Sequence, residues 1–347
     1  MTHVYVGMSG GVDSSLSAAL LKEQGYQVTG VYMKNWTRDL PGMQCPWADD
    51  LADAKRVAVH LGIPFKVFDF QTEYKQLVVD YMLDEYRAGR TPNPDIMCNQ
   101  DVKFGLFLKA ALKDDADMIA TGHYAGSRGS HLLRAADEDK DQTYFLYRIT
   151  GDAVEHTIFP LAKYKTKAEV RADAAARGLA TARKRDSQGI CFVGTVGIRE
   201  FLSQYIETEP GDIIERETGK VLGRHDGAIF YTLGQRHGLN VGGGLPYYVV
   251  GKDMAKNEVY VSRNLNSAEF FVGQIRLADV HWINDPLHSG DTCQIRVRHR
   301  AKLVDAVVDV DGDYIVIKPS ESERAIAPGQ SIVLYKGEEC LGGGIVI

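Results

Sequence analysis

Cysteine is scarce in this chain, and its distribution excludes several kinds of protein. Five cysteines occur among 347 residues, at positions 45, 98, 191, 293 and 340. Their odd number and the absence of a C-x-x-C pair argue against a secreted disulfide framework and against a site built on paired cysteines. We therefore expect a reducing, cytoplasmic environment, with no zinc ion and no iron–sulfur cluster.

Long apolar runs and targeting signals are also missing. No stretch of about 18 apolar residues occurs, so we expect no membrane span and no membrane partner. The N-terminal MTHVYVGMSGG has neither a basic region nor a cleavable apolar segment, so nothing in it indicates export. A hydrophobic fraction of 44% with 25% charged residues is typical of a globular protein, and the length predicts two or three domains.

The net charge of −6 disfavours a nucleic-acid partner, but the basic residues are unevenly distributed. Eight lysines and arginines lie between Lys163 and Arg185, against two acids, and four more alternate from Arg296 to Lys302 along an apparent strand. The charge pattern alone leaves two interpretations equally open, namely solvated faces or the footprint of a polyanion.

The first half of the chain alternates short apolar strands with amphipathic helices. We expect strands at Val4–Met8, Val28–Met33, Phe65–Phe68 and Met118–Thr121, and helices at Ser14–Gln24, Asp49–Leu61, 72–88, 99–113 and Lys167–Arg177. This order predicts an α/β domain of Rossmann-like type, with a parallel sheet, helices on both faces and ligands beyond the carboxyl ends of the strands.

After about residue 198 the sequence becomes rich in turns and strands. From residue 268 the expected strands are Gln274–Leu277, Cys293–Val297, Ala306–Val310, Tyr314–Ile317, Ser331–Tyr335 and Gly343–Ile347, a spacing typical of a barrel or sandwich. We therefore predict an α/β nucleotide-binding domain at 1–198, a small central domain at 199–267 and a β-domain at 268–347.

The loop GMSGGVDSS, residues 7–15, follows the first expected strand and opens the first expected helix. Gly10 and Gly11 leave backbone N–H groups uncovered and three serines add hydroxyl donors, an arrangement that binds anions. It matches neither G-x-x-x-x-G-K-[ST] nor G-x-G-x-x-G. Asp13 would repel phosphates unless Mg²⁺ intervenes or the carboxylate faces away. On these residues alone, a glycine turn that merely caps a helix is the alternative.

Cys98 lies in TPNPDIMCNQDVKFG, residues 91–105, between a proline-rich loop and an expected helix. Pro92 and Pro94 favour extended backbone upstream, and Asn99 is expected to cap the helix. Cys98 would then lie at the positive end of a helix dipole, where a thiolate is favoured and a thiol becomes reactive.

Cys191 is the second candidate thiol and lies in RKRDSQGICFVG, residues 183–194. Three basic residues upstream would favour a thiolate or persulfide anion, and Gly189 and Gly194 permit close approach or movement. A buried structural cysteine is the alternative, and the tetrapeptide ICFV alone favours it. Cys45, Cys293 and Cys340 belong to no motif, and we interpret them as structural.

The string SGGVDS resembles the pyrophosphate-binding loop of the PP-loop ATP pyrophosphatases, which adenylate a carbonyl oxygen and let a nucleophile displace AMP. With it, an ordered set of motifs resembles one family, the tRNA-specific 2-thiouridylases, over nearly the whole chain. These motifs are NPDIMCN, GHYA (122–125), DQTYFL (141–146), DSQGICFVG, GQRHGL (234–239) and APGQ (327–330).

The resemblance assigns a role to each matching position. It implies that Cys98 is the nucleophile and that Cys191 carries sulfur as a persulfide. It implies ATP contacts from Gly7, Met8, Ser9, Gly10, Gly11, Val12, Asp13, Ser14, Met33 and Gly122, target-base contacts from Asn93, Pro94 and Asp95, and tRNA contacts from His123, Lys140, Asp141, Gln142, Arg298, His299 and Gln330. It also implies a β-barrel for the last domain.

The implied reaction is ATP-dependent 2-thiolation of the wobble uridine of tRNA. Adenylation would turn the uracil 2-oxygen into a leaving group, with Mg²⁺ accompanying ATP and no metal site of the protein's own. Either Cys98 attacks a Cys191 persulfide and releases sulfide, or the persulfide attacks the base directly. An upstream persulfide-carrying protein would supply the sulfur.

Two other functions are compatible with parts of the sequence. A PP-loop ligase that uses ammonia or an amino acid would share the glycine loop but would need no cysteines. A redox-sensitive RNA-binding protein without catalytic activity would use the loop only as a helix cap.

Overall fold

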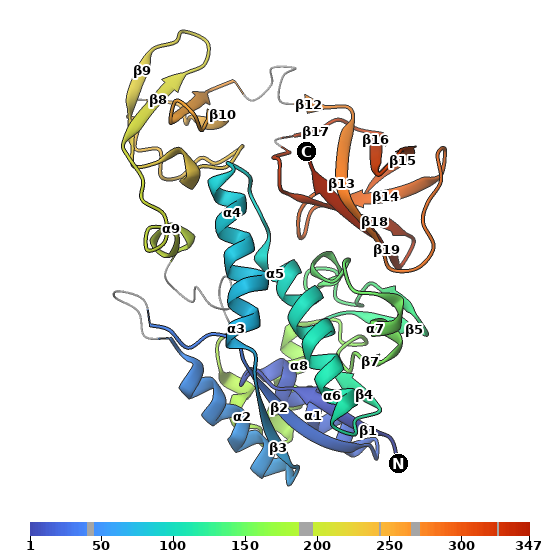
Figure 1. Ribbon diagram of the computed structural model, residues 1–347. Coiled ribbons are helices and arrows are strands. Elements are labelled where there is room, and N and C mark those ends of the chain that lie inside the picture. Colours follow the sequence, from blue (N-terminus) through green and yellow to red (C-terminus); the bar gives the residue numbers. More distant parts are fainter. Residues whose placement is uncertain (40–44, 187–196, 243, 265–270, 325) are drawn as a thin grey trace.

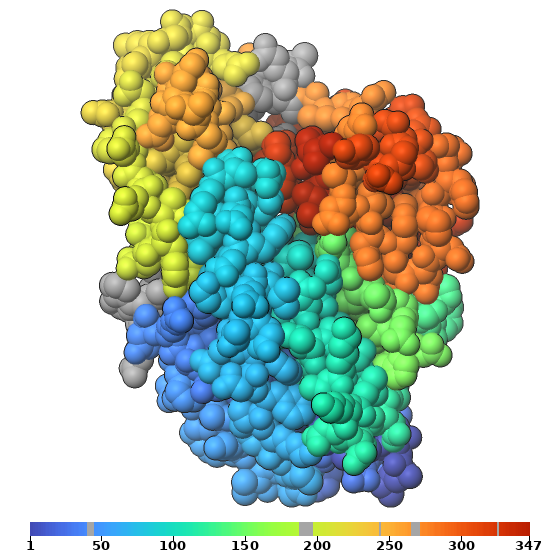
Figure 2. Space-filling model, in the orientation of Figure 1, coloured from blue at the N-terminus to red at the C-terminus, as the bar shows by residue number. Residues whose placement is uncertain are grey.

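The computed structural model describes residues 1–39, 45–186, 197–242, 244–264, 271–324 and 326–347. Figure 1 shows three lobes: an α/β lobe that holds the N-terminus, a small β-rich lobe, and a β-barrel that holds the C-terminus. The helices of residues 71–87 run from the first lobe up between the other two, and in Figure 2 they fill the space between the lobes.

A five-stranded parallel sheet organises the α/β lobe. Its strands, in spatial order, are β3 (Phe65–Asp69), β2 (Gln27–Lys34), β1 (His3–Gly7), β4 (Met118–Ala120) and β7 (Thr157–Ile158). Side chains alternate between the faces of β1: Val4 and Val6 pack toward one core and Tyr5 toward the other. Because β2 and β4 both flank β1, the strand order reverses there, which is where such sheets bind ligands.

Helices cover both faces of this sheet. One face packs against α1 (Val12–Glu23), α2 (Trp47–Leu61) and α8 (Lys167–Ala176). The other packs against two long helices that each contain a π-helical segment. The first consists of α3 (Gln71–Tyr74), η1 (Lys75–Asp80) and α4 (Tyr81–Arg87); the second consists of α5 (Pro94–Met97), η2 (Cys98–Phe107) and α6 (Leu108–Lys113). We call the second one, residues 94–113, the Cys98 helix.

Between this sheet and the barrel lie the hairpin β5 (Gly126–Arg128) and β6 (His131–Leu133) and the short helices η3 (Thr143–Phe145) and α7 (Gly151–Glu155). The short helix η4 (Ala180–Arg183) packs instead with α1, α2 and α8. The hairpin is absent from our sequence predictions because its strands are short and lack an alternating apolar pattern.

The central lobe begins with α9 (Ile198–Leu202) and is built on a four-stranded sheet. Its strands, in spatial order, are β10 (Tyr248–Asp253), β11 (Glu258–Ser262), β8 (Gly211–Glu215) and β9 (Val221–His225), with η5 (Ala228–Phe230) after β9. Ile213, Val249, Val259 and Val261 form its small separate core.

Six antiparallel strands close the C-terminal barrel. They are β13 (Ile275–Trp282), β16 (Tyr314–Pro319), β15 (Val304–Asp311), β14 (Thr292–Arg296), β18 (Ser331–Lys336) and β19 (Glu339–Val346), and β19 pairs back to β13. A short pair, β12 (Phe271–Val272) with β17 (Glu323–Arg324), lies beside it. Hairpin β5–β6 adds to β19 through the pairs Glu339 with Leu133 and Cys340 with Leu132. One hydrogen-bonded sheet therefore crosses from the α/β lobe into the barrel.

The predicted fold class is confirmed: a Rossmann-like parallel-sheet domain is followed by a small central domain and a β-barrel. The exact boundaries at 198 and 267 stay predictions. Among the residues that the structure describes, no helix is both long and apolar enough to cross a membrane.

Candidate functional site

The glycine loop (residues 7–14) joins β1 to α1 at the point where the strand order reverses. Gly10 has a φ of +74°, and a Cβ there would lie 2.4 Å from the carbonyl oxygen of Asp50, so glycine is required. Ser9 N donates a hydrogen bond to Ser14 Oγ at 3.1 Å, and Gly11 is the N-cap of α1. The loop thus gathers backbone and hydroxyl donors at a helix N-terminus, the arrangement that suits an anion.

Two further residues with an expected nucleotide contact lie against this loop. A Cβ on Gly7 would lie 3.0 Å from Met33 Cε, and a Cβ on Gly122 would lie 2.7 Å from Ser14 N. Met33 lies near the end of β2 and Gly122 follows β4, so the three central strands bring these residues together.

Asp13, the acidic residue of the loop, is neutralised by a lysine that the sequence analysis missed. Lys167 Nζ lies 2.8 Å and 2.6 Å from the two carboxylate oxygens of Asp13, and the Tyr124 hydroxyl donates to Asp13 Oδ1 at 2.9 Å. Burial and the Asp13 charge raise the pKa of Tyr124, so its hydroxyl remains a donor. The same ammonium lies 3.0 Å from Asp186 Oδ1. Nothing in the basic stretch 163–185 singles out Lys167 in advance.

Cys98 lies in the second turn of its helix, so the prediction that Asn99 caps this helix was wrong. The N-cap is Asn93, whose side chain accepts a hydrogen bond from Asp95 N at 3.2 Å, and Pro94 occupies the first helical position, where a missing N–H does no harm. Because the dipole effect fades beyond the first turn, it favours a Cys98 thiolate less than we expected. The Cys98 residue is 2% exposed.

The Cys98 helix reaches both the glycine loop and the barrel. Near its end, Phe107 Cε1 lies 3.5 Å from where a Cβ on Gly7 would be. Next to Cys98, Asn99 is buried and its Nδ2 donates to the carbonyl oxygen of Phe145 at 2.9 Å. The centroid of the Phe145 ring in turn lies 4.6 Å from the centroid of the His299 ring. A single helix therefore connects the anion-binding loop with a segment expected to contact RNA.

The residues expected to receive the target base follow a point where all three lobes meet. Thr91 N donates to the carbonyl oxygen of Pro328 in the barrel at 2.9 Å, and Thr91 Oγ1 lies 3.3 Å from Thr232 Oγ1 in the central lobe. Asn93, Pro94 and Asp95 come directly after it. Burial raises the pKa of Asp95, with the positive charge of Lys103 acting in the opposite direction.

Two of the seven residues expected to contact tRNA have buried side chains. His123 Nδ1 shares a hydrogen bond of 2.9 Å with Thr121 Oγ1, and burial holds the pKa of His123 well below its ordinary value. Asp141 is 1% exposed; it accepts from Arg296 Nη1 at 2.8 Å and from Thr143 Oγ1 at 2.9 Å. Asp141 also accepts from the backbone N–H groups of Ala135 and Thr143, so it holds neighbouring backbone in place.

The other five residues expected to contact tRNA are at least partly exposed: Lys140, Gln142, Arg298, His299 and Gln330. Gln142 Oε1 accepts from Tyr124 N at 2.9 Å, and Gln330 Oε1 accepts from Ala327 N at 3.0 Å. Arg298 Nη2 donates to the carbonyl oxygen of Arg324 at 2.8 Å. They come from the α/β lobe and the barrel, on the two sides of the boundary that Phe145 and His299 bridge.

The two basic clusters of the sequence are only partly available to a polyanion. In the first cluster, four side chains form ion pairs within the chain: Lys167 and Arg171 with Asp186, Arg177 with Glu23, and Lys184 with Asp50 and Asp53. In the second, strand β14 ends at Arg296, whose side chain is 5% exposed and paired with Asp141. Both interpretations of the charge pattern, a solvated face and a polyanion footprint, require exposed side chains, and the buried Arg296 fits neither.

Cys191 lies outside the described residues, as do Gly189 and Gly194. The cysteines interpreted as structural, Cys45, Cys293 and Cys340, are buried, as expected. Burial raises the pKa of Cys45 and raises that of Cys293 to about 12, which makes both poor nucleophiles. Among the described residues, no group of three or more histidine, cysteine or acidic side chains is arranged to hold a metal ion.

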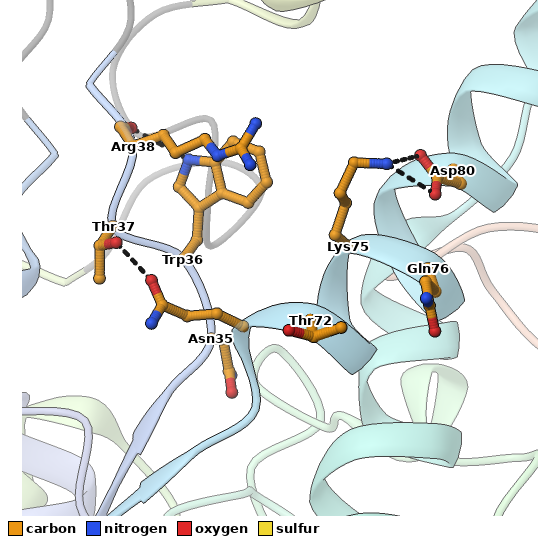
Figure 3. A pocket seen from close by; sticks show the side chains of 9 residues that line it. Asn35, Trp36, Thr37, Arg38, Thr72, Lys75, Gln76 and Asp80 are labelled. Atoms are coloured by element: carbon orange, nitrogen blue, oxygen red, sulfur yellow. Dashed lines mark hydrogen bonds and ion pairs between the residues drawn. The ribbon is translucent and has the colours of Figure 1, made fainter.

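A polar pocket of about 450 Å³ lies at the carboxyl ends of β2 and β3, and β2 is the strand that carries Met33. Figure 3 shows Trp36 and Arg38 on one wall and Lys75 on the other. The π-helical turn η1 places Lys75 and Asp80, five positions apart, on one side, where Lys75 Nζ lies 2.8 Å from Asp80 Oδ1. Arg38 is thus the cation of this pocket that has no acidic partner among the pocket's described residues.

Comparison with known proteins places this geometry in one group. Family profiles described as "tRNA methyl transferase HUP domain", "tRNA methyl transferase PRC-barrel domain" and "Aminomethyltransferase beta-barrel domain" match residues 2–195, 199–263 and 272–346. The chain is 45% identical to the tRNA-specific 2-thiouridylase MnmA of Bacillus subtilis, over 99% of this chain and 95% of the relative. The proteins of the same name in Enterococcus faecalis (43%; 99% and 95%) and Streptococcus sanguinis (45%; 99% and 94%) are similarly related.

Proposed function

The chain belongs to the family of tRNA-specific 2-thiouridylases, and from this membership we propose how it thiolates the wobble uridine of tRNA at its 2-position. The activity is that of a tRNA sulfurtransferase. The structural observation that supports the mechanism is the Cys98 helix, which carries the buried Cys98 near Phe145 and reaches the glycine loop through Phe107. The tRNA substrate implies action in the cytoplasm.

The glycine loop binds ATP in this proposal. Its donors at the N-terminus of α1 hold the phosphates, Met33 and Gly122 border the nucleotide, and Lys167 keeps Asp13 from repelling it. Mg²⁺ bound together with ATP would shield the charge of its phosphates. The uracil 2-oxygen attacks the α-phosphorus, pyrophosphate leaves, and the oxygen becomes part of an AMP leaving group.

Asn93, Pro94 and Asp95 receive the target base after it leaves the anticodon stack. Lys140, Gln142, Arg298, His299 and Gln330 contact the tRNA around it, while His123 and Asp141 act from buried positions. Contacts to phosphates fix where the tRNA lies on the protein but carry no information about its base sequence. In this proposal Asn93, Pro94 and Asp95 therefore select the base, and the basic side chains position the tRNA.

Sulfur transfer uses Cys98 and Cys191. An upstream protein that carries a persulfide transfers its outer sulfur to Cys191, which becomes a persulfide. In one route the Cys98 thiolate attacks the Cys191 sulfur, a Cys98–Cys191 disulfide forms, and the released hydrosulfide displaces AMP from C2. In the other route the terminal persulfide sulfur attacks C2 directly and AMP leaves, which joins Cys191 to the base through a disulfide. The Cys98 thiolate then attacks the Cys191 sulfur, so that this S–S bond breaks, a Cys98–Cys191 disulfide forms and the outer sulfur stays on the base. In both routes an external thiol must reduce the disulfide before the next turnover.

The test measures product and half-reaction separately. The protein is incubated with unmodified tRNA, ATP, Mg²⁺ and a persulfide donor, and the digested tRNA is analysed by mass for 2-thiouridine. We expect 2-thiouridine from the wild type and none from Cys98→Ser or Cys191→Ser, with Cys293→Ser as the cysteine control. Adenylated tRNA should still form in both inactive variants if they fold.

The same assay decides among the other functions. A mass increase of one methyl group in place of sulfur would support the methyl transfer named in two of the family profiles. A product that carries nitrogen in place of the activated oxygen, formed at the full rate in both cysteine variants, would favour an amide-forming ligase. No formation of AMP with tRNA and a sulfur donor would favour RNA binding without catalysis.

A further inference from the structure

Two side chains of the Cys98 helix, directly after Cys98, are held by groups at the barrel boundary. Asn99 donates to the carbonyl oxygen of Phe145, as described above. At the next position, Gln100 Oε1 accepts a hydrogen bond from Arg148 Nε. The mechanism assigns no role to Arg148, although it is one of two buried arginines in the described part of the chain, with 8% of the residue exposed.

Arg148 joins this helix to one strand of the barrel. Its Nη1 donates to the carbonyl oxygen of Asp279 at 3.0 Å and lies 3.0 Å from the carboxylate oxygen Oδ2 of the same residue. A guanidinium can make these bonds at once because its donors point in fixed, diverging directions, which an ammonium group lacks. Arg148 is therefore a rigid connector between β13 and Gln100, two residues after Cys98.

Asp279 occupies an unusual backbone conformation at this contact. Its φ is +47°, in the left-handed region that non-glycine residues rarely adopt, and the pairing of β13 with β19 shifts register between Ala278 and His281. Such bulges redirect a side chain or carbonyl, and strained residues persist where surrounding contacts hold them. On the same bulge, His281 Nε2 donates to the carbonyl oxygen of Ile149 at 3.0 Å, next to Arg148.

We propose that Arg148, anchored by Asp279, is a positioning residue for Cys98 that transmits the placement of the barrel to the nucleophile through Gln100. When the barrel holds tRNA, the bulge of β13 fixes the guanidinium, and the guanidinium fixes the register of the helix that carries the thiol. The inference rests on the proposed sulfur-transfer function and adds to it a route from the RNA-binding domain to the reacting sulfur.

The contact is tested from both ends. Arg148→Met removes the connector, and Gln100→Leu leaves the Arg148–Asp279 contact but cuts its connection to the helix. For both we expect kcat for 2-thiouridine formation to fall by between about tenfold and a hundredfold, because small misplacement of a reacting group has effects of this size. KM for tRNA and for ATP should stay within about twofold. The double variant should lose no more than the larger single effect, because both act on one connection.

Two further variants separate positioning from general loss of structure. Arg148→Lys keeps the positive charge but lacks the diverging N–H donors of the guanidinium, so it should show a kcat between those of the wild type and Arg148→Met. His131→Gln breaks another contact between the α/β lobe and the barrel, His131 Nδ1 to Glu339 Oε1 at 2.6 Å, which does not touch the Cys98 helix. It should keep the wild-type kcat. Unchanged kcat in Gln100→Leu, equal loss in His131→Gln, or additive losses in the double variant would each overturn the proposal.

A second measurement does not depend on the proposed activity. The rate of Cys98 alkylation by iodoacetamide, followed on the Cys98 peptide by mass spectrometry, reports how firmly the buried thiol is held. We expect a rise of about tenfold in Gln100→Leu and no rise in His131→Gln. An unchanged rate in Gln100→Leu would contradict the positioning role. A wild type that forms no 2-thiouridine but shows this difference would refute the proposed function alone.

Discussion

Lys167 Nζ lies 2.6 Å from Asp13 Oδ2, so the acid in the glycine loop meets a cation that comes from a helix 154 positions later in the chain. The pair resolves a conflict in the sequence, where a carboxylate occurs among groups that suit phosphates. It also links the start of α8 to the glycine loop.

Replacing Lys167 should weaken ATP binding. In Lys167→Met, Asp13 keeps its charge without a partner and repels the triphosphate, so we expect KM for ATP to rise about tenfold, which corresponds to about 1.4 kcal/mol. Lys167→Arg should restore part of the affinity. The matched control is Lys165→Met, two positions earlier in the same basic stretch. Equal KM values for the 167 and 165 variants would contradict the role of the pair.

The buried pair of Asp141 and Arg296 should matter for stability more than for direct RNA contact. Arg296→Met leaves the buried Asp141 carboxylate with only the longer ion pair to Arg134, whose Nε lies 3.8 Å from Asp141 Oδ2. We expect the free energy of unfolding to fall by about 3 kcal/mol. Urea denaturation measures this loss. Lys140→Gln, at the neighbouring and more exposed position, should lower the affinity for tRNA with little change in the free energy of unfolding. A stable Arg296→Met protein with weakened RNA binding would instead make Arg296 an RNA contact.

Stability should fall as the pH drops below about 6.5, in part because of His123. Burial holds the pKa of His123 well below its ordinary value, so the folded state keeps the ring neutral while the unfolded chain takes up a proton. The unfolded state therefore binds more protons in this window, and the free energy of unfolding decreases with decreasing pH. Urea denaturation between about pH 5 and pH 8 tests this. His123→Gln should flatten the dependence, and His237→Gln, at an exposed position, should not.

Charge reversal at Arg298 should weaken tRNA binding and leave ATP binding intact. If the exposed guanidinium contacts one phosphate, the slope of log K for tRNA binding against the logarithm of the salt concentration should become smaller in magnitude by about 0.7 to 0.9 in Arg298→Glu. Arg276→Glu, on strand β13 of the same barrel, is the control. Filter binding of labelled tRNA over a salt series measures both slopes. An equal loss of tRNA and ATP affinity would mean that Arg298 acts through the fold.

The sequence predicted those parts of the site that depend on local patterns. The glycine loop and the strands that flank it are set by short apolar runs and by glycine positions, and they occur within one or two residues of where we expected them. The start of the Cys98 helix was misplaced because two asparagines, Asn93 and Asn99, are both suitable caps. Pro94 should have decided between them, since proline is favoured at the first helical position.

Contacts between distant segments could not be predicted in the same way. Lys167 and Arg148 are ordinary basic residues in the sequence, and their roles depend on which acid the fold brings to them. Arg296 belongs to an alternating strand pattern that predicts exposure, but the barrel closes that side against Asp141 and Tyr335. Charge patterns indicate how many cations a segment has and leave open which of them face the solvent.

The hairpin β5–β6 gives the protein a property that its three-domain description hides. Because Leu132 and Leu133 pair with the edge of the barrel, the two outer domains share one hydrogen-bond ladder. A fragment that begins at residue 268 would expose the edge of β19 to other chains, and a fragment that ends near residue 198 would leave β6 without its partner. Thus the units that sequence comparison separates are expected to unfold together, and a truncated version of either would be prone to self-association.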